Sequence, residues 1–170
     1  MFLLFLINLL FLYTHTLAVF FIAAQNIYYF LLKKKGAIVV KSWIILQLLL
    51  LLAFLPWIQI FLLQASVWQN MVWMPAPTIR DIAGTLSTYS GSILLTLVFC
   101  VLILKALIPY KKEQLKFNFL VFWLAFPTAL LLVFCFLFQS IYLQKYTIAS
   151  SLPFFILVAY GIQSFEQKKH

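Results

Sequence analysis

The chain has 170 residues, of which 66% are hydrophobic and only 9% are charged, and its formal net charge is +9. A soluble domain cannot cover so large an apolar fraction with so few polar residues, so the composition indicates an integral membrane protein. The basic residues sit in short clusters between apolar runs, which argues against a nucleic-acid partner.

The first apolar run extends from Met1 to Leu32 and is interrupted at Tyr13–Thr16. As one straight helix it would be about 48 Å long, well beyond a hydrocarbon core of about 30 Å. Two interpretations stand. The run is one long, tilted helix, or it is two segments that turn near Tyr13, the first of which is too short to cross.

Four further helices are predicted, over about residues 43–64, 90–108, 117–138 and 152–165. Pro56 lies inside the first of these and predicts a kink, because proline removes a backbone donor. The last helix has an alternative start nearer Thr147. The fold class expected is therefore all-α, a polytopic membrane protein with about five membrane segments and one membrane domain over residues 1–170. Cys100 and Cys135 lie inside apolar runs, and no disulfide is expected between them.

The charges predict the orientation. With alternate loops on opposite sides, two basic residues, Arg80 and Lys145, fall on one side. The other ten fall on the opposite side: Lys33, Lys34, Lys35, Lys41, Lys105, Lys111, Lys112, Lys116, Lys168 and Lys169. The side with ten is predicted to be cytoplasmic, together with the amino terminus, in the cytoplasmic membrane of a bacterium. The loops Gln64–Gly91 and Gln139–Ser151 are then extracytoplasmic.

The polar stretch Gln64–Gly91 is expected to contain a short interfacial helix. Thr78 is a suitable N-cap and Asp81 follows three residues later, which favours a capping role for Asp81 over a functional one. Four apolar residues share one helical face and predict contact with the outer membrane surface. They are Ile79, Ile82, Ala83 and Leu86.

Arg80 has two interpretations: it binds a lipid phosphate, to which guanidinium geometry is suited, or it is an interfacial arginine. Lys145, followed by Tyr146, is the other extracytoplasmic cation and has the same two interpretations. Trp68 and Trp73 are most simply aromatic anchors at the membrane surface, with stacking on a sugar as the alternative.

His15 is an ionisable residue at or near the membrane, which makes it a candidate for function. A lone histidine is more often a neutral, hydrogen-bonded residue in a helix contact. The chain has 3 acidic residues, and Asp81 is the one expected outside the cytoplasm. The sequence therefore predicts no catalytic residue, no metal site and no cofactor within this chain.

Four local patterns in fixed order resemble the carboxyl-side membrane half of bacterial GT-C glycosyltransferases. The likeness is to members related to dolichyl-phosphate-mannose protein mannosyltransferases and lipid A aminoarabinose transferases. The patterns are Tyr13-Thr14-His15 before a helix with Gln25 and Tyr28-Tyr29; Leu55-Pro56-Trp57-Ile58 before Gln64; Trp73-Met-Pro-Ala-Pro77 before Gly91; and Lys145-Tyr146 before Ser151-Leu-Pro153.

This resemblance implies an enzyme that transfers a sugar from a polyprenyl-phosphate donor outside the cytoplasmic membrane. Family members are longer, and their catalytic aspartate lies in an early loop that has no counterpart here. They usually carry Arg-Tyr where this chain has Lys145-Tyr146, and lysine lacks the bidentate fork of arginine. The chain is thus expected to be part of such an enzyme, inactive alone and completed by a missing amino-terminal half or a partner subunit.

Two other classes of function remain open at this point. One is a small non-catalytic membrane scaffold or accessory subunit. The other is a transporter fragment, which is disfavoured because strongly polar residues are missing from the middle of the last three predicted helices. Membrane lipids are expected neighbours in every case.

Overall fold

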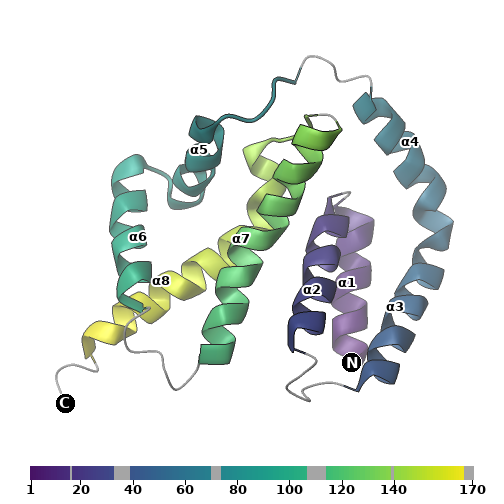
Figure 1. The fold of residues 1–170 in the computed structure, drawn as a ribbon, viewed down its shortest axis with the longest axis horizontal. Coiled ribbons are helices and arrows are strands. Elements are labelled where there is room, and N and C mark those ends of the chain that lie inside the picture. The colour runs from purple at the N-terminus through teal and green to yellow at the C-terminus, as the bar shows by residue number, and fades with distance from the viewer. Residues whose placement is uncertain (16, 33–38, 70–73, 107–113, 139, 167–170) are drawn as a thin grey trace. The chain divides into compact units, whose positions relative to one another are not determined.

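The computed structural model describes residues 1–15, 17–32, 39–69, 74–106, 114–138 and 140–166, and these ranges contain helices and no strand (Figure 1). The elements are α1 (Phe2–Thr14), α2 (Ala18–Leu32), α3 (Val40–Phe54), η2 (Leu55–Trp57), α4 (Ile58–Gln69), α5 (Ile79–Ser90), α6 (Ile93–Ala106), α7 (Gln114–Leu137), η4 (Gln144–Ser150) and α8 (Ser151–Glu166). The all-α prediction is confirmed for the part of the chain described. The chain divides into two compact units, Met1–Met74 and Pro75–His170. The single membrane domain expected over residues 1–170 stays a prediction.

Three helical stretches are long and apolar enough to cross a membrane: Val40–Gln64, Leu115–Leu137 and Gln144–Ser164. Helices α5 and α6 form a fourth candidate only as a pair, because the chain bends by 87° between them. Helices α1 and α2 are apolar but shorter. Within the described ranges the chain therefore has 3 to 4 candidate spans, as in a multi-pass membrane protein.

The first apolar run forms two helices, α1 and α2, which is the second of the two interpretations of residues 1–32. In the unit Met1–Met74, Leu12 and Ala18 form a buried cluster with Leu50 and Phe54 of α3. A polar contact joins the first two helices, since the Asn8 amide donates to Gln25 Oε1 at 2.7 Å.

Pro56 lies in the 3₁₀ turn η2 between α3 and α4. The Leu55 N–H reaches the carbonyls of both Leu51 and Leu52, as expected where proline interrupts regular α-helical hydrogen bonding. The Tyr13 hydroxyl donates to the Ala53 carbonyl at 2.8 Å. The kink predicted at Pro56 thus takes the form of a local 3₁₀ turn that α1 helps to satisfy.

A polar network joins α2 and α3. The Trp43 indole N–H donates to Asn26 Oδ1 at 2.9 Å, and Asn26 Nδ2 donates to the Ile22 carbonyl and to Gln47 Oε1. The rings of Tyr29 and Trp43 stack beside it, with centroids 4.4 Å apart. Gln47 Nε2 is buried and has no hydrogen-bond partner.

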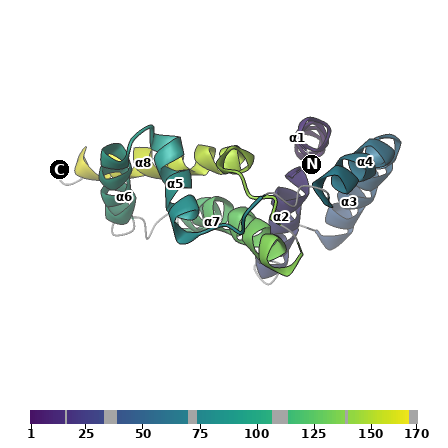
Figure 2. The same ribbon diagram turned by 90° about the horizontal axis from the view of Figure 1, so that it is seen from above.

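In the unit Pro75–His170, α6 packs closely on α8. A Cβ atom placed on Gly161 would lie 2.2 Å from the Leu102 carbonyl oxygen, so only glycine allows this approach. Ala106, Phe117, Leu120 and Leu157 form a buried cluster that joins α6, α7 and α8. Figures 1 and 2 both show α5 beside α6. The turn between the two helices contains Gly91, whose φ is 83°.

Candidate functional site

Helix α5 is held against the segment from Tyr142 to Thr147 by side-chain hydrogen bonds; we call this the α5–η4 contact. Thr85 Oγ1 and Tyr142 Oη are 2.5 Å apart, and both residues are buried. The Tyr89 hydroxyl lies 2.6 Å from both the carbonyl and the hydroxyl oxygen of Thr147. The buried side of α5 is therefore polar, and its partners lie more than fifty positions later in the chain.

The direction of each bond in this contact follows from its neighbours. The Thr85 hydroxyl donates to the Asp81 carbonyl at 3.1 Å, so the Tyr142 hydroxyl is the donor to Thr85. The Thr88 hydroxyl donates to Gln144 Oε1 at 2.7 Å, and Gln144 Nε2 lies 3.5 Å from the Asp81 carbonyl. A Cβ atom on Gly84 would lie 2.5 Å from Gln144 Nε2, so Gly84 leaves room for this amide.

The start of α5 contains a capping box. The Thr78 side chain accepts from the Asp81 N–H at 3.3 Å, and Asp81 Oδ2 accepts from the Thr78 N–H at 2.9 Å. Asp81 Oδ2 also lies 2.6 Å from Thr78 Oγ1. This is the geometry of the capping interpretation, and it engages the Asp81 carboxylate in local structure.

The predicted apolar face of α5 is divided in the structure. The Ile79 side chain is 86% exposed, whereas Leu86 packs against the buried cluster of Tyr89, Phe154 and Val158. One end of the face therefore points outward and the other contributes to the core of this unit.

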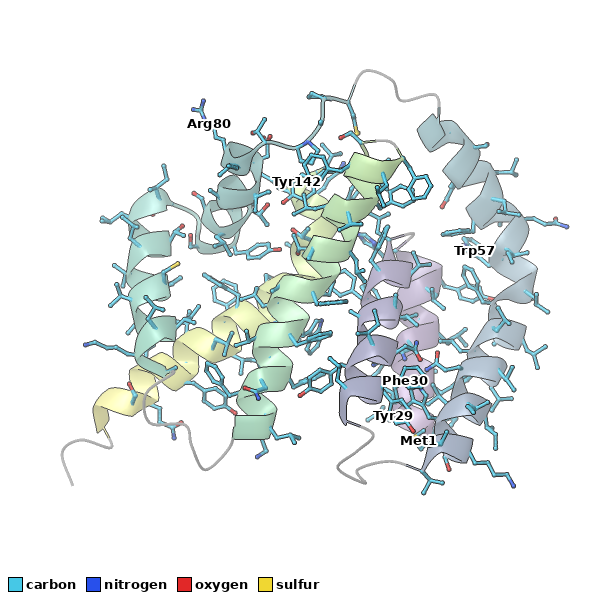
Figure 3. All side chains as sticks on the ribbon, in the orientation of Figure 1. Met1, Tyr29, Phe30, Trp57, Arg80 and Tyr142 are labelled. Carbon is cyan, nitrogen blue, oxygen red and sulfur yellow. The ribbon has the colours of Figure 1, made fainter. Side chains whose placement is uncertain are left out.

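Arg80 and Lys145, the two cations predicted to be extracytoplasmic, lie on the two elements that the α5–η4 contact joins. Arg80 is exposed on the first turn of α5, and Figure 3 shows its side chain pointing away from Tyr142. Lys145 is exposed on η4, with its Nζ atom 5.5 Å from the centre of the Tyr146 ring. The fold therefore brings together two elements whose cations are 65 residues apart in sequence.

His15 lies in the other unit, in the turn between α1 and α2. Its Nδ1 atom accepts from the Leu17 N–H at 3.2 Å, and its carbonyl accepts from the Ala18 N–H at 2.9 Å. Nδ1 must be unprotonated to accept this bond. Partial burial lowers the pKa of His15, which also favours the neutral ring. His15 is thus a neutral residue that helps to start α2. Trp73 and the side chain of Trp68 lie outside the described residues, so their predicted roles as anchors stay predictions.

Sequence reasoning missed the polar residues of the α5–η4 contact: Thr85, Thr88, Tyr89, Tyr142, Gln144 and Thr147. A signal is present for the first three, because Thr85, Thr88 and Tyr89 share one side of a helix at spacings of three and four. Their partners give no such signal in a single sequence. Among the residues that the structure describes, no group of three or more His, Cys, Asp or Glu side chains is placed to hold a metal ion. Searches of protein-family models, curated proteins and solved structures found no match to this chain.

Proposed function

We propose that the chain is part of an integral membrane glycosyltransferase that takes a sugar from a polyprenyl-phosphate donor on the extracytoplasmic side of a bacterial cytoplasmic membrane. In this proposal the chain has five membrane segments, with α5 and η4 at the extracytoplasmic side. The donor phosphate binds near Arg80 and Lys145, with Tyr146 beside it. The resemblance of the four sequence patterns motivates the proposal.

The observation that carries the proposal is the α5–η4 contact. It places two elements, each with an exposed cation, against each other at one end of the unit Pro75–His170. Guanidinium and ammonium groups bind phosphate through charge-assisted hydrogen bonds. Other lysines of this unit, Lys105 and Lys116, lie near the cluster of Ala106 and Phe117, on the side that the charge distribution assigns to the cytoplasm.

Direct binding of a polyprenyl phosphate to the purified chain tests the proposal. Native mass spectrometry in detergent would compare the wild type with Arg80→Gln and Lys145→Gln, using the polyprenol without phosphate as the control ligand. Each substitution is expected to weaken binding about tenfold to a hundredfold, the effect of losing one charge-assisted hydrogen bond. The matched control is Lys41→Gln, which removes an exposed lysine from the first turn of α3. Equal binding of polyprenol and polyprenyl phosphate would overturn the proposal.

We also expect the 170-residue chain to be inactive alone, because the one carboxylate of α5 is engaged in the capping box. Sugar transfer by the purified chain would contradict this expectation. The same engagement of Asp81 favours a second candidate, a non-catalytic accessory subunit that packs against a membrane partner. The adjoining coding sequence separates the two, since a neighbouring reading frame with an acidic extracytoplasmic loop favours the enzyme.

A further inference from the structure

The unit Met1–Met74 exposes polar side chains at one level, near the turn between α1 and α2. Tyr13 and Thr14 are exposed at the end of α1. The ring centroid of Tyr13 lies 5.3 Å from that of Trp57, and Gln59 is the first exposed polar residue after Trp57. Figure 3 shows Trp57 near this turn. Two separate elements therefore change from apolar to polar at the same level.

A second polar level lies at the other end of these helices. The stacked rings of Tyr29 and Trp43 hold the end of α2 beside the start of α3. Lys41 is exposed on the first turn of α3, just before Trp43. Helix α2 ends at Leu32, and the sequence continues from there into three lysines.

Between the two levels, the exposed side chains of the described part of this unit are apolar. Leu48, Leu51 and Leu52 of α3 are each more than half exposed, as expected against acyl chains. The amide side chains at these depths are turned inward and bond in two pairs, Asn8 with Gln25 and Asn26 with Gln47. The exposed surface between Lys41 and Gln59 thus forms an apolar belt with a polar edge on each side.

The apolar belt is thinner than a typical hydrocarbon core of about 30 Å. Helices α3 and α4 rise about 27 Å from Lys41 to Gln59, and α2 is about 22 Å long. The candidate span Leu115–Leu137 of the other unit is about 33 Å long. A long helix fits a thinner bilayer by tilting, but a short helical hairpin cannot lengthen, so the bilayer has to adapt to it.

We propose that the unit Met1–Met74 is matched to a bilayer with a hydrocarbon core of about 22 to 27 Å, and that it thins a thicker bilayer around itself. The partner that the apolar belt fits is phospholipid with short acyl chains. The turn between α1 and α2 then reaches the membrane surface, where its exposed polar side chains are solvated. The inference concerns the lipid around this unit and does not depend on the proposed glycosyltransferase.

Competition between phospholipids of different chain length tests the proposal in the full chain. Vesicles would contain phosphatidylcholine with monounsaturated chains of fourteen, eighteen or twenty-two carbons, each mixed with a brominated eighteen-carbon lipid that quenches tryptophan. The variant Trp123→Phe keeps tryptophans only in the unit Met1–Met74. Its fluorescence is expected to show a preference of about twofold or more for the fourteen-carbon over the twenty-two-carbon lipid.

Two exposed glutamines of α4 provide a matched pair of variants. Gln59→Leu removes the polar edge of the apolar belt, so the preference should shift toward longer chains. Gln64→Leu changes a glutamine beyond this edge and should leave the preference as it is. Helical content by circular dichroism checks that each variant folds.

Three results would overturn the proposal. Equal affinity for the three chain lengths, or the highest affinity for the longest, would show that this unit is not matched to a thin bilayer. An unchanged preference in Gln59→Leu would show that Gln59 is not an edge of the belt. A spin label on Thr14→Cys, in a chain carrying Cys100→Ala and Cys135→Ala, is expected to be accessible to a water-soluble nickel chelate. Its protection in fourteen-carbon vesicles would show that the turn lies inside the bilayer.

Discussion

The Tyr89 hydroxyl is bonded to Thr147, a residue 58 positions later, and this bond ties α5 to the start of the candidate span Gln144–Ser164. The Thr147 hydroxyl itself donates to the Gln144 carbonyl, so Tyr89 is the donor in the pair. A single interaction thus connects the capped helix α5, the 3₁₀ turn η4 and, through the ring contact of Tyr89 with Phe154, the core of α8.

Replacing Tyr89 with Phe should destabilise the protein by about 1–2 kcal/mol, because the ring stays packed while a buried hydrogen bond is lost. Unfolding in mixed detergent and SDS micelles, followed by circular dichroism, measures the change. A double-mutant cycle with Thr147→Val is the control. Thr147→Val removes the hydroxyl acceptor but leaves the Thr147 carbonyl, so the two substitutions should be partly non-additive, and simple additivity would show that Tyr89 bonds to the carbonyl alone.

The Gly84→Ala substitution should depend on Gln144. In the wild type, the added methyl group meets Gln144 Nε2 and disrupts its bonds to α5, so the usual gain of about 1 kcal/mol for replacing a helical glycine should be absent. In a Gln144→Ala background, which removes the obstructing amide, Gly84→Ala should stabilise the protein. The same unfolding assay measures both. A gain of equal size in the two backgrounds would contradict the close contact.

Gln47→Met should be neutral or stabilising. The Trp43 indole can only donate, so it fixes Asn26 with its Oδ1 facing the indole. Asn26 Nδ2 then donates to Gln47 Oε1, which fixes the orientation of the Gln47 amide. In this orientation Gln47 Nε2 is buried and has no partner. Removing a buried donor without a partner relieves a cost of about 1–3 kcal/mol. Asn26→Leu is the matched contrast and should destabilise, because it leaves the Trp43 N–H without its acceptor. A loss of stability with Gln47→Met would indicate that Nε2 has a partner in the membrane.

Stability should fall as the pH is lowered from 7 to 5, because the folded state holds His15 neutral. Its pKa is lowered on folding by burial, so the unfolded chain binds more protons as the pH falls below about 6.5. Stability from this group is therefore complete above the unfolded pKa and is lost as the pH falls toward the folded one. His15→Asn keeps an acceptor for the Leu17 N–H without titrating, and should flatten the pH profile. Both the wild type and His15→Asn would also carry His170→Ala, which removes the other histidine. If stability still depended on pH as steeply in His15→Asn, the pH dependence would not come from His15.

Local features of the fold were predictable from the sequence, whereas distant contacts were not. The capping box of Thr78 and Asp81 spans three residues, and its chemistry is fixed by those residue types alone. The pairing of Thr85 with Tyr142 depends on how α5, α6, α7 and α8 pack, and hydroxyl residues are common in many loops. The interruption at Tyr13–Thr16 was visible, but only the packing of α1 and α2 beside α3 makes it a turn between two helices. The apolar face of α5 was visible too, but not that Leu86 would join the core of this unit.

The α5–η4 contact has a consequence for how the protein is made. Thr85, Thr88 and Tyr89 leave the ribosome well before Tyr142, Gln144 and Thr147, their hydrogen-bond partners. Until the chain beyond α7 has been synthesised, Thr85 and Thr88 can bond to carbonyls of α5 itself, whereas the Tyr89 hydroxyl has its partners only in Thr147. The contact that holds α5 can therefore form only after α7 and η4 have been synthesised, as one of the last events of assembly.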